Sequence, residues 1–138
     1  MTTHTIHVTK FDLERLQKLL HEAYHSEYRQ SEYLKRLRAE LNRALIVEPQ
    51  EIPANVITMN SRVVLEDLET GEEEIYTLVF PEAADVKQGK ISILAPIGTA
   101  MLGYKMGDIF EWEVPAGKRS LRVKQVLYQP EASGDYHL

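Results

Sequence analysis

The stretch PIGTAMLGYKMGDIFEWEV, residues 96–114, predicts a short helix followed closely by a strand. Pro96 suits the first turn of a helix because that turn leaves its amides unpaired, and Gly103 follows the apolar run as a typical stop. The apolar side chains of this helix would face a sheet: Ile97, Ala100 and Met101. After Asp108 apolar and acidic residues alternate, which turns one set inward. The inward set is Phe110, Trp112 and Val114. The stretch therefore predicts a helix packed on a β-sheet.

Four further segments in the second half of the chain have the composition of strands. They are rich in β-branched and aromatic residues and are separated by turn signals that contain glycine. Together with the strand above, the segments are residues 56–68, 74–80, 90–95, 108–114 and 120–129. The alternation of the last segment breaks at Gln125, which favours a β-bulge there. We therefore expect an antiparallel β domain with one short helix over residues 51–138.

Residues 1–50 have a helical period instead. Leucines recur every three or four residues in two runs, the spacing of a seam that packs two helices together. Thr9 followed by Asp12 resembles a capping box, and Pro49 ends the second run. The link HSEYRQSE is short and polar, so two helices of about 18 residues, each roughly 27 Å long, would fold back on each other. The expected fold is α+β: an antiparallel two-helix coiled-coil hairpin followed by the β domain.

The composition describes an ordinary globular protein and excludes several function classes. The chain has 138 residues, 43% hydrophobic and 27% charged, with a net charge of −5. Without cysteine it has no thiolate catalysis, disulfide or thiolate zinc site. No segment has the roughly 18 apolar residues of a membrane span, and the opening MTTHTIHVTK does not resemble a signal peptide, so we expect a cytoplasmic protein. No cluster of Lys and Arg is interleaved with aromatics, so direct binding to nucleic acid is not expected.

The segment His21-Glu22-Ala23-Tyr24-His25 matches H-E-x-x-H, the zinc-peptidase pattern. Such a site also needs a third protein ligand and a cleft with a sheet edge that holds the peptide. Too few residues precede this helix to supply that sheet, and the two imidazoles fall outside the leucine seam. The favoured interpretation is two solvent-facing histidines near a helix end, where positive charge suits the helix dipole. We assign no catalytic residue, metal site or cofactor.

The β-rich half carries the motifs of a known family. EIPANVITMNSRVVLEDLETGEEEIYTLVFP, residues 51–81, resembles the entry to the C-terminal domain of the Gre transcript-cleavage factors. Residues 92–128 resemble the turn and closing hairpin of that domain, whose fold is like that of the FK506-binding isomerases (FKBP-like). Within this superfamily, VITMNSRV, the Trp of EWEVPAG and the ending YQPEASGDYHL resemble the Rnk family, the regulators of nucleoside diphosphate kinase.

The resemblance implies a transcription regulator that binds RNA polymerase near its secondary channel. Gre factors dock their globular domain on the channel rim and point a long hairpin inward, and acidic residues at its tip help hold a catalytic Mg²⁺. The hairpin expected here is shorter. Its tip carboxylates, Glu22, Glu27 and Glu32, include no adjacent acidic pair. We therefore expect the chain to occupy the channel and to compete with Gre factors without stimulating transcript cleavage.

The same resemblance locates a docking loop. Gre factors present an acidic-Ser-Pro loop to the polymerase, and the corresponding residues here are Leu94, Ala95 and Pro96, of which only the proline matches. On this reading Pro96 and Ile97, with Ala95 beside them, would insert against a partner helix. On the structural alternative, Pro96 only starts the short helix.

Three other functions are weighed against this one. A Gre-type cleavage factor is the nearest alternative. A prolyl isomerase would need an open aromatic pocket, whereas one Trp and three Phe, with Glu alternating on the same strand, favour core packing. A zinc peptidase is the third. We expect no enzyme activity, and an effect on nucleoside diphosphate kinase would be indirect, through transcription. The sequence makes no prediction of oligomeric state.

Overall fold

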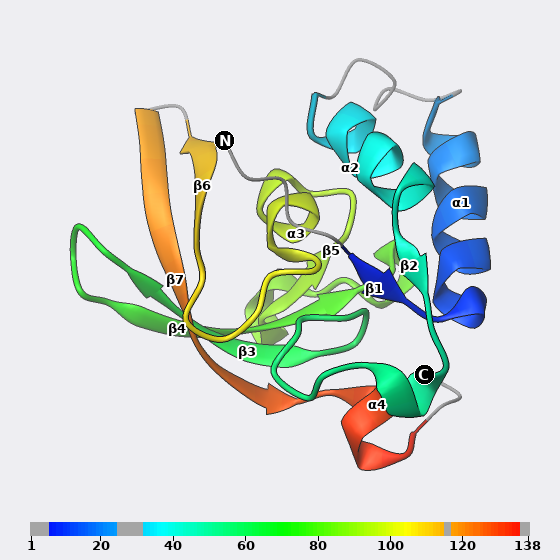
Figure 1. Ribbon diagram of the computed structural model, residues 1–138. Coiled ribbons are helices and arrows are strands. Elements are labelled where there is room, and N and C mark those ends of the chain that lie inside the picture. Colours follow the sequence, from blue (N-terminus) through cyan, green and yellow to red (C-terminus); the bar gives the residue numbers. More distant parts are fainter. Residues whose placement is uncertain (1–5, 25–31, 115–116, 136–138) are drawn as a thin grey trace.

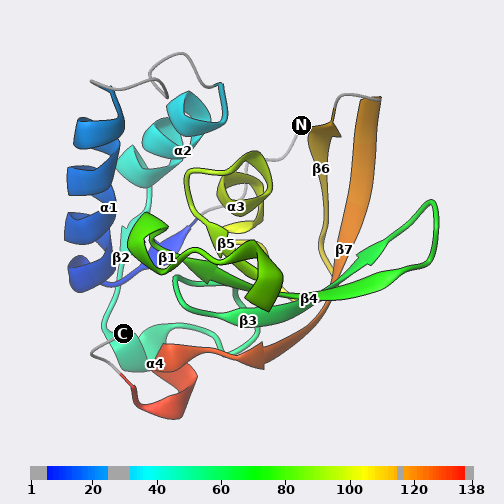
Figure 2. The same cartoon turned by 180° about the vertical axis from the view of Figure 1, so that it is seen from behind.

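Two helices that lie side by side form the N-terminal part of the described structure (Figures 1 and 2). The computed structural model describes residues 6–24, 32–114 and 117–135. The helices are α1 (Lys10–Tyr24), of 15 residues, and α2 (Glu32–Asn42), of 11 residues. The predicted helical hairpin is confirmed, and the described parts of both helices are shorter than the roughly 18 residues expected. None of the described helices is both long enough and apolar enough to cross a membrane.

Thr9 caps α1, as the capping pattern predicts. Its hydroxyl accepts a hydrogen bond from the backbone amide of Asp12 at 3.1 Å, one of the first-turn amides that have no partner within a helix. Beyond the cap, the leucine seam is buried along both helices. Its members are Leu13, Leu16, Leu20, Leu34, Leu37 and Leu41.

A pair of short parallel strands closes the base of the hairpin, and the sequence analysis missed it. β1 (His7–Val8) pairs with β2 (Leu45–Ile46). The amide of Val47 extends the ladder by donating to the carbonyl oxygen of Val8 at 2.9 Å. Two residues per strand are too few to produce a recognisable period. The pair ties the chain that enters α1 to the chain that leaves α2.

The five predicted strands form one sheet in the order β5-β4-β3-β7-β6. They are β3 (Arg62–Asp67), β4 (Glu73–Val79), β5 (Lys90–Ser92), β6 (Ile109–Val114) and β7 (Gly117–Tyr128). Three neighbouring pairs are antiparallel, as expected. The β4–β5 pair is parallel, so the expectation of a wholly antiparallel sheet is wrong there. The physical reason is the connection between the two strands. It is not a tight hairpin turn but passes through two 3-10 turns, η3 (Pro81–Ala83) and η4 (Val86–Gln88), so β5 can start at the same end as β4 and run parallel to it.

The pairing of β3 with β7 contains the predicted irregularity. Val64 lies opposite Gln125, and the next residue, Leu65, lies opposite Val123, so one residue of β7 is skipped beside Gln125. An extra residue of this kind bends a strand and increases its twist. The bulge expected at Gln125 is therefore confirmed.

The short helix α3 (Pro96–Met101) is also present where the sequence predicts it, and it contacts α2, β5 and β6. Ile97 and Met101 are buried beneath it, whereas Ala100 is half-buried. Gly98 faces the backbone that precedes the helix. A Cβ atom at Gly98 would collide with the carbonyl oxygen of Ser92 and lie 3.2 Å from the Cα of Ile93. Glycine is therefore required for α3 to approach the β5 end so closely.

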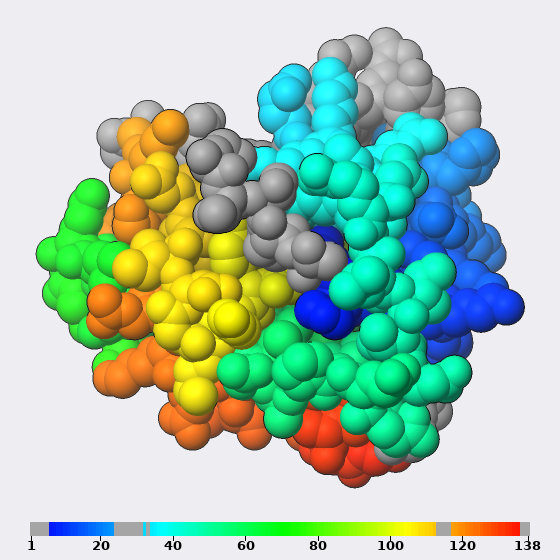
Figure 3. Space-filling view, viewed as in Figure 1, coloured from blue at the N-terminus to red at the C-terminus, as the bar shows by residue number. Residues whose placement is uncertain are grey.

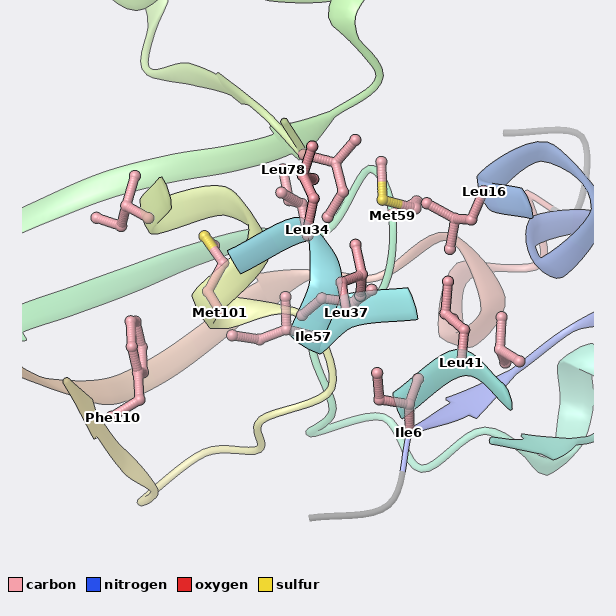
Figure 4. Packing of buried hydrophobic residues seen from close by; sticks show 14 of the residues in the cluster. Ile6, Leu16, Leu34, Leu37, Leu41, Ile57, Met59, Leu78, Met101 and Phe110 are labelled. Carbon is pink, nitrogen blue, oxygen red and sulfur yellow. The ribbon is translucent and has the colours of Figure 1, made fainter. Parts of the chain in front are cut away.

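One hydrophobic cluster joins the hairpin to the sheet (Figure 4). The seam leucines share it with Met101 of α3 and with the inner face of the sheet, which includes Val63, Leu65, Leu78 and Val123. Phe110 is buried in the cluster and stacks on Tyr104, with ring centroids 5.2 Å apart. Trp112 is half-buried against the cluster, and the side chain of Val114 lies outside the described part. The FKBP-like character and a domain boundary at residue 50 stay predictions.

We predict that Gly98→Ala lowers the free energy of unfolding by about 2 kcal/mol or more. Overpacking a core costs about 1–3 kcal/mol, and here the collision is with backbone atoms that cannot rotate away. Urea unfolding followed by circular dichroism would measure the change.

Gly71→Ala is the matched control, because Gly71 has a φ of +76° but no neighbouring atom within 4 Å of an added Cβ. Its expected cost is about 1 kcal/mol, from backbone conformation alone. Equal costs for the two substitutions would contradict the close approach of α3.

Candidate partner-binding surface

The loop before α3 presents Pro96 to solvent. A tight turn positions it, since the amide of Ala95 donates to the carbonyl oxygen of Ser92 at 3.0 Å. Ala95 caps the helix, and its carbonyl oxygen accepts hydrogen bonds from the amide and the hydroxyl of Thr99, at 2.9 and 3.1 Å. Pro96 is the first helical residue and is exposed. It therefore starts the helix and also remains accessible to a partner.

Ile97 takes the sheet-facing position that the helical pattern predicts, and its role in docking stays a prediction. Only 9% of Ile97 is exposed, and it belongs to the hydrophobic cluster. Its side chain points inward because α3 packs its apolar face on the sheet, so a partner would reach Ile97 only by lifting the helix. Of the three predicted docking residues, the exposed Pro96 and the half-buried Ala95 are the ones placed to meet a partner.

The predicted tip carboxylates stand on different helices. Glu22 is exposed near the end of α1, and Glu32 is exposed at the start of α2, where it lies 3.5 Å from the ammonium nitrogen of Lys35. Glu27 lies outside the described residues. Within residues 6–24, 32–114 and 117–135, no group of three or more His, Asp or Glu side chains is placed to hold a metal ion.

His21, the first residue of the H-E-x-x-H segment, lines a hollow between the two helices. His21 is exposed, as predicted, and His25 lies outside the described residues. The hollow has a volume of about 230 Å³ and is lined by Gln17, Leu20, His21, Arg38, Leu41 and Asn42. Among the described residues the lining supplies one imidazole, and the absence of a zinc site stays a prediction.

Arg15 links α1 to the end of β4. Its guanidinium carbon lies 4.0 Å from the ring centroid of Phe11 and 4.5 Å from that of Phe80. Cation–π contacts of this kind contribute about 0.5–1 kcal/mol at partly exposed sites. We call Phe11, Arg15 and Phe80 the arginine clasp. Because Phe80 follows β4 and Phe11 belongs to α1, the clasp helps to fix the direction of the hairpin relative to the sheet.

A buried polar cluster adjoins the clasp. Asp12, which forms an ion pair with Arg15, is 3% exposed, and Glu131 of α4 (Pro130–Ser133) is 8% exposed. The carboxylate of Glu131 accepts a hydrogen bond from the hydroxyl of Thr58 at 2.7 Å. Burial raises the pKa of the Asp12 carboxyl above its ordinary 3.8, against the lowering effect of Arg15, and the charge of Glu131 adds to the rise. The first turn of α1 therefore buries a carboxyl group, that of Asp12, whose ionisation costs the folded chain stability.

The clasp and the polar cluster were missed at the level of sequence. Part of the signal was present, because Phe11 and Asp12 precede Arg15 by four and three residues, a spacing that brings side chains together on one helix face. Phe80 and Glu131 come from distant parts of the chain, and no local spacing relates them to α1.

We predict that Asp12→Asn gains stability relative to the wild type as the pH rises above 3.8. The folded chain holds the Asp12 proton more tightly than the unfolded chain, so ionisation costs the wild type stability between pH 3.8 and the raised pKa, and the full penalty persists above it. Asn carries no such penalty. Urea unfolding at several pH values from about 4 to about 7 measures the difference.

Glu14→Gln removes an exposed carboxyl from the same helix and controls for the loss of one negative charge. A stability difference between Asp12→Asn and wild type that stays constant over this pH range would contradict the raised pKa of Asp12.

Two family models match the chain in its two halves. The model described as the C-terminal part of the transcription elongation factors GreA/GreB matches residues 52–128. The model described as the Rnk N-terminus matches residues 5–47. The first covers the sheet, α3 and the Pro96 loop, and the second covers the helical hairpin with its β1–β2 base.

Known proteins match the chain over the whole or part of its length. The regulator of nucleoside diphosphate kinase of Escherichia coli is 40% identical over the whole of both chains. The transcription elongation factor GreA of Beijerinckia indica is 37% identical over 67% of this chain and 59% of its own length. The solved structure of a prokaryotic transcription elongation factor GreA/GreB from Nitrosomonas europaea is 41% identical, covers 90% of this chain and 100% of that one, and superimposes with a TM-score of 0.78. The chain therefore belongs to the Rnk family, within the GreA/GreB group of transcription factors.

Proposed function

We propose that this chain regulates transcription by binding RNA polymerase at the rim of its secondary channel. In this proposal the Pro96 loop docks the body, the α1–α2 hairpin points into the channel, and the chain competes there with Gre factors without stimulating transcript cleavage. The exposed Pro96 loop supports binding to the polymerase, and the short hairpin supports the absence of transcript cleavage.

The Pro96 loop has the properties of a docking element on a rigid base. Pro96 is exposed, while Ala95 is held by Thr99 and Ile97 is buried directly beneath the loop. The glycine contact at Gly98 fixes the helix against the β5 end. A partner that contacts Pro96 would therefore meet a preformed surface and lose little conformational entropy on binding.

The hairpin helices are short for a rod that must reach a distant active centre. At 1.5 Å per residue, α1 extends about 22 Å and α2 about 16 Å. The seam leucines pack into the shared cluster as far as Leu20 and Leu34, so most of the described length of each helix lies against the body. A rod of this reach supports occupancy of a channel entrance more readily than delivery of a group to its end.

The tip chemistry supports the same conclusion. Mg²⁺ demands oxygen ligands in near-octahedral geometry and is usually held by one or two carboxylates placed close together. Glu22 and Glu32 are exposed on separate helices, and Glu32 has Lys35 as a neighbour. The Gre-type cleavage factor thus remains the alternative that the experiment below distinguishes, and any effect on nucleoside diphosphate kinase would act through transcription.

We predict that the purified chain co-elutes with core RNA polymerase and that Pro96→Glu weakens this binding at least tenfold, about 1.4 kcal/mol. Glutamate is tolerated at the first residue of a helix, where the dipole favours negative charge, so the variant should fold. Gln50→Glu, an exposed site that adds the same charge elsewhere, should bind like the wild type.

Stalled transcription complexes test whether the chain competes with Gre factors without stimulating transcript cleavage. Added chain should leave the rate of transcript cleavage at that of polymerase alone and should reduce the stimulation produced by a GreA factor. Failure to bind at micromolar concentration and low salt would refute the polymerase proposal, and stimulation of cleavage would favour the Gre-type alternative.

A further inference from the structure

A second surface, separate from the Pro96 loop, lies where β4 meets the turn before β5. It is a hollow of about 540 Å³, with walls from β3, β4 and η4. Three basic residues, Arg62, Lys87 and Lys90, line it, against one acidic residue, Glu74. The carboxylate of Glu74 accepts a hydrogen bond from the hydroxyl of Tyr76 at 2.8 Å. The hollow is therefore locally basic on a chain whose net charge is −5.

The charges of the hollow are not neutralised within the described part of the chain. On the neighbouring strand β7, three basic residues each have a carboxylate partner: Arg119 with Asp67, Arg122 with Glu66, and Lys124 with Glu73. Basic residues of β7 are thus paired, whereas Arg62 of β3, Lys87 of η4 and Lys90 of β5, which line the hollow, form no ion pair with a described residue.

The backbone of the hollow excludes a simple anion cradle. Small anions such as phosphate are typically held by free backbone amides at a loop or turn. Here the amides of Gln88 and Lys90 donate to the carbonyl oxygen of Asp85, at 3.0 and 2.9 Å, and the amide of Lys87 donates to its carboxylate at 3.1 Å. The amide of Gly89 donates to the carbonyl oxygen of Val86 at 3.1 Å. The amides of residues 87–90 are therefore occupied, so a ligand would be held mainly by side chains.

Aliphatic side chains flank these cations. Val86 is 81% exposed and Ile75 is 47% exposed, and both line the hollow. Gly89 fixes the turn close to β4, because a Cβ there would lie 2.7 Å from the carbonyl oxygen of Ile75, at a φ of +71°. Long cationic side chains next to exposed aliphatic ones are suited to a polypeptide that alternates carboxylates with apolar residues.

We propose that this hollow docks an acidic, extended polypeptide segment of a partner protein. Carboxylates of the segment would pair with Arg62, Lys87 and Lys90, and an aliphatic side chain would cover Val86 and Ile75. The site is distinct from the Pro96 loop, and the inference holds whether or not the partner is RNA polymerase.

The test uses the full chain labelled with ¹⁵N and an N-acetylated peptide of alternating Glu and Val residues. We expect the peptide to shift the amide signals of residues 86–90 and of Ile75, with an affinity that falls as salt is added. Lys87→Glu should weaken binding at least about fivefold, because it replaces an attraction with a repulsion. Val86→Ser should weaken it as well, since the aliphatic contact is lost.

Lys105→Glu is the matched control, because Lys105 is exposed outside the hollow and the substitution changes the net charge equally. It should change the affinity less than about twofold. The proposal is overturned if the peptide does not bind, if Lys105→Glu and Lys87→Glu act equally, or if inorganic phosphate shifts the same amides as strongly. Self-association that Lys87→Glu abolishes would make a second copy the occupant, and would also overturn it.

Discussion

The burial of the leucine seam in the cluster beneath the sheet is the constraint on which the other features depend. A free two-helix hairpin could point in any direction, whereas here Leu16, Leu37 and Leu41 belong to one buried cluster with Ile57 and Met59, which precede β3, and with Met101 of α3 (Figure 4). Densely packed side chains leave few alternative arrangements. This packing fixes the direction of the hairpin relative to α3, the helix that begins at Pro96.

The sequence predicted the elements better than their assembly. Periodicity and β-rich composition located α1, α2 and the five strands of the main sheet, Pro96 and Gly103 marked the ends of α3, and the break at Gln125 marked a real bulge. The parallel pairing of β5 was missed because strand direction depends on the path of the connection and not on the strand itself. Ile97 faces the sheet, as its position in the helical pattern predicts, whereas the family resemblance had placed it in the docking loop.

Acidic and basic residues occupy different parts of the surface, which the net charge of −5 does not reveal. The β3–β4 turn projects at the rim of the molecule, far from α1 (Figures 1 and 3), and carries Glu69 and Glu72 in exposed positions. Basic residues of β7 form ion pairs with Glu66 of β3 and Glu73 of β4, whereas the basic residues that line the hollow at η4 form no ion pair with a described residue. No periodic pattern encodes this division, since Arg62 and Lys87 meet only when β3 and η4 come together in the fold.

The parallel pair β1–β2 holds the base of the hairpin together independently of the length of its helices. It clamps both feet of the hairpin to each other, whereas the far ends, at Tyr24 and Glu32, stand away from the sheet (Figures 1 and 2). Equal insertions at those ends would extend the rod by about 5.4 Å per helical turn and leave the foot, the core and the loop unaltered. The length of the hairpin and the surface of the β domain can therefore change independently in evolution.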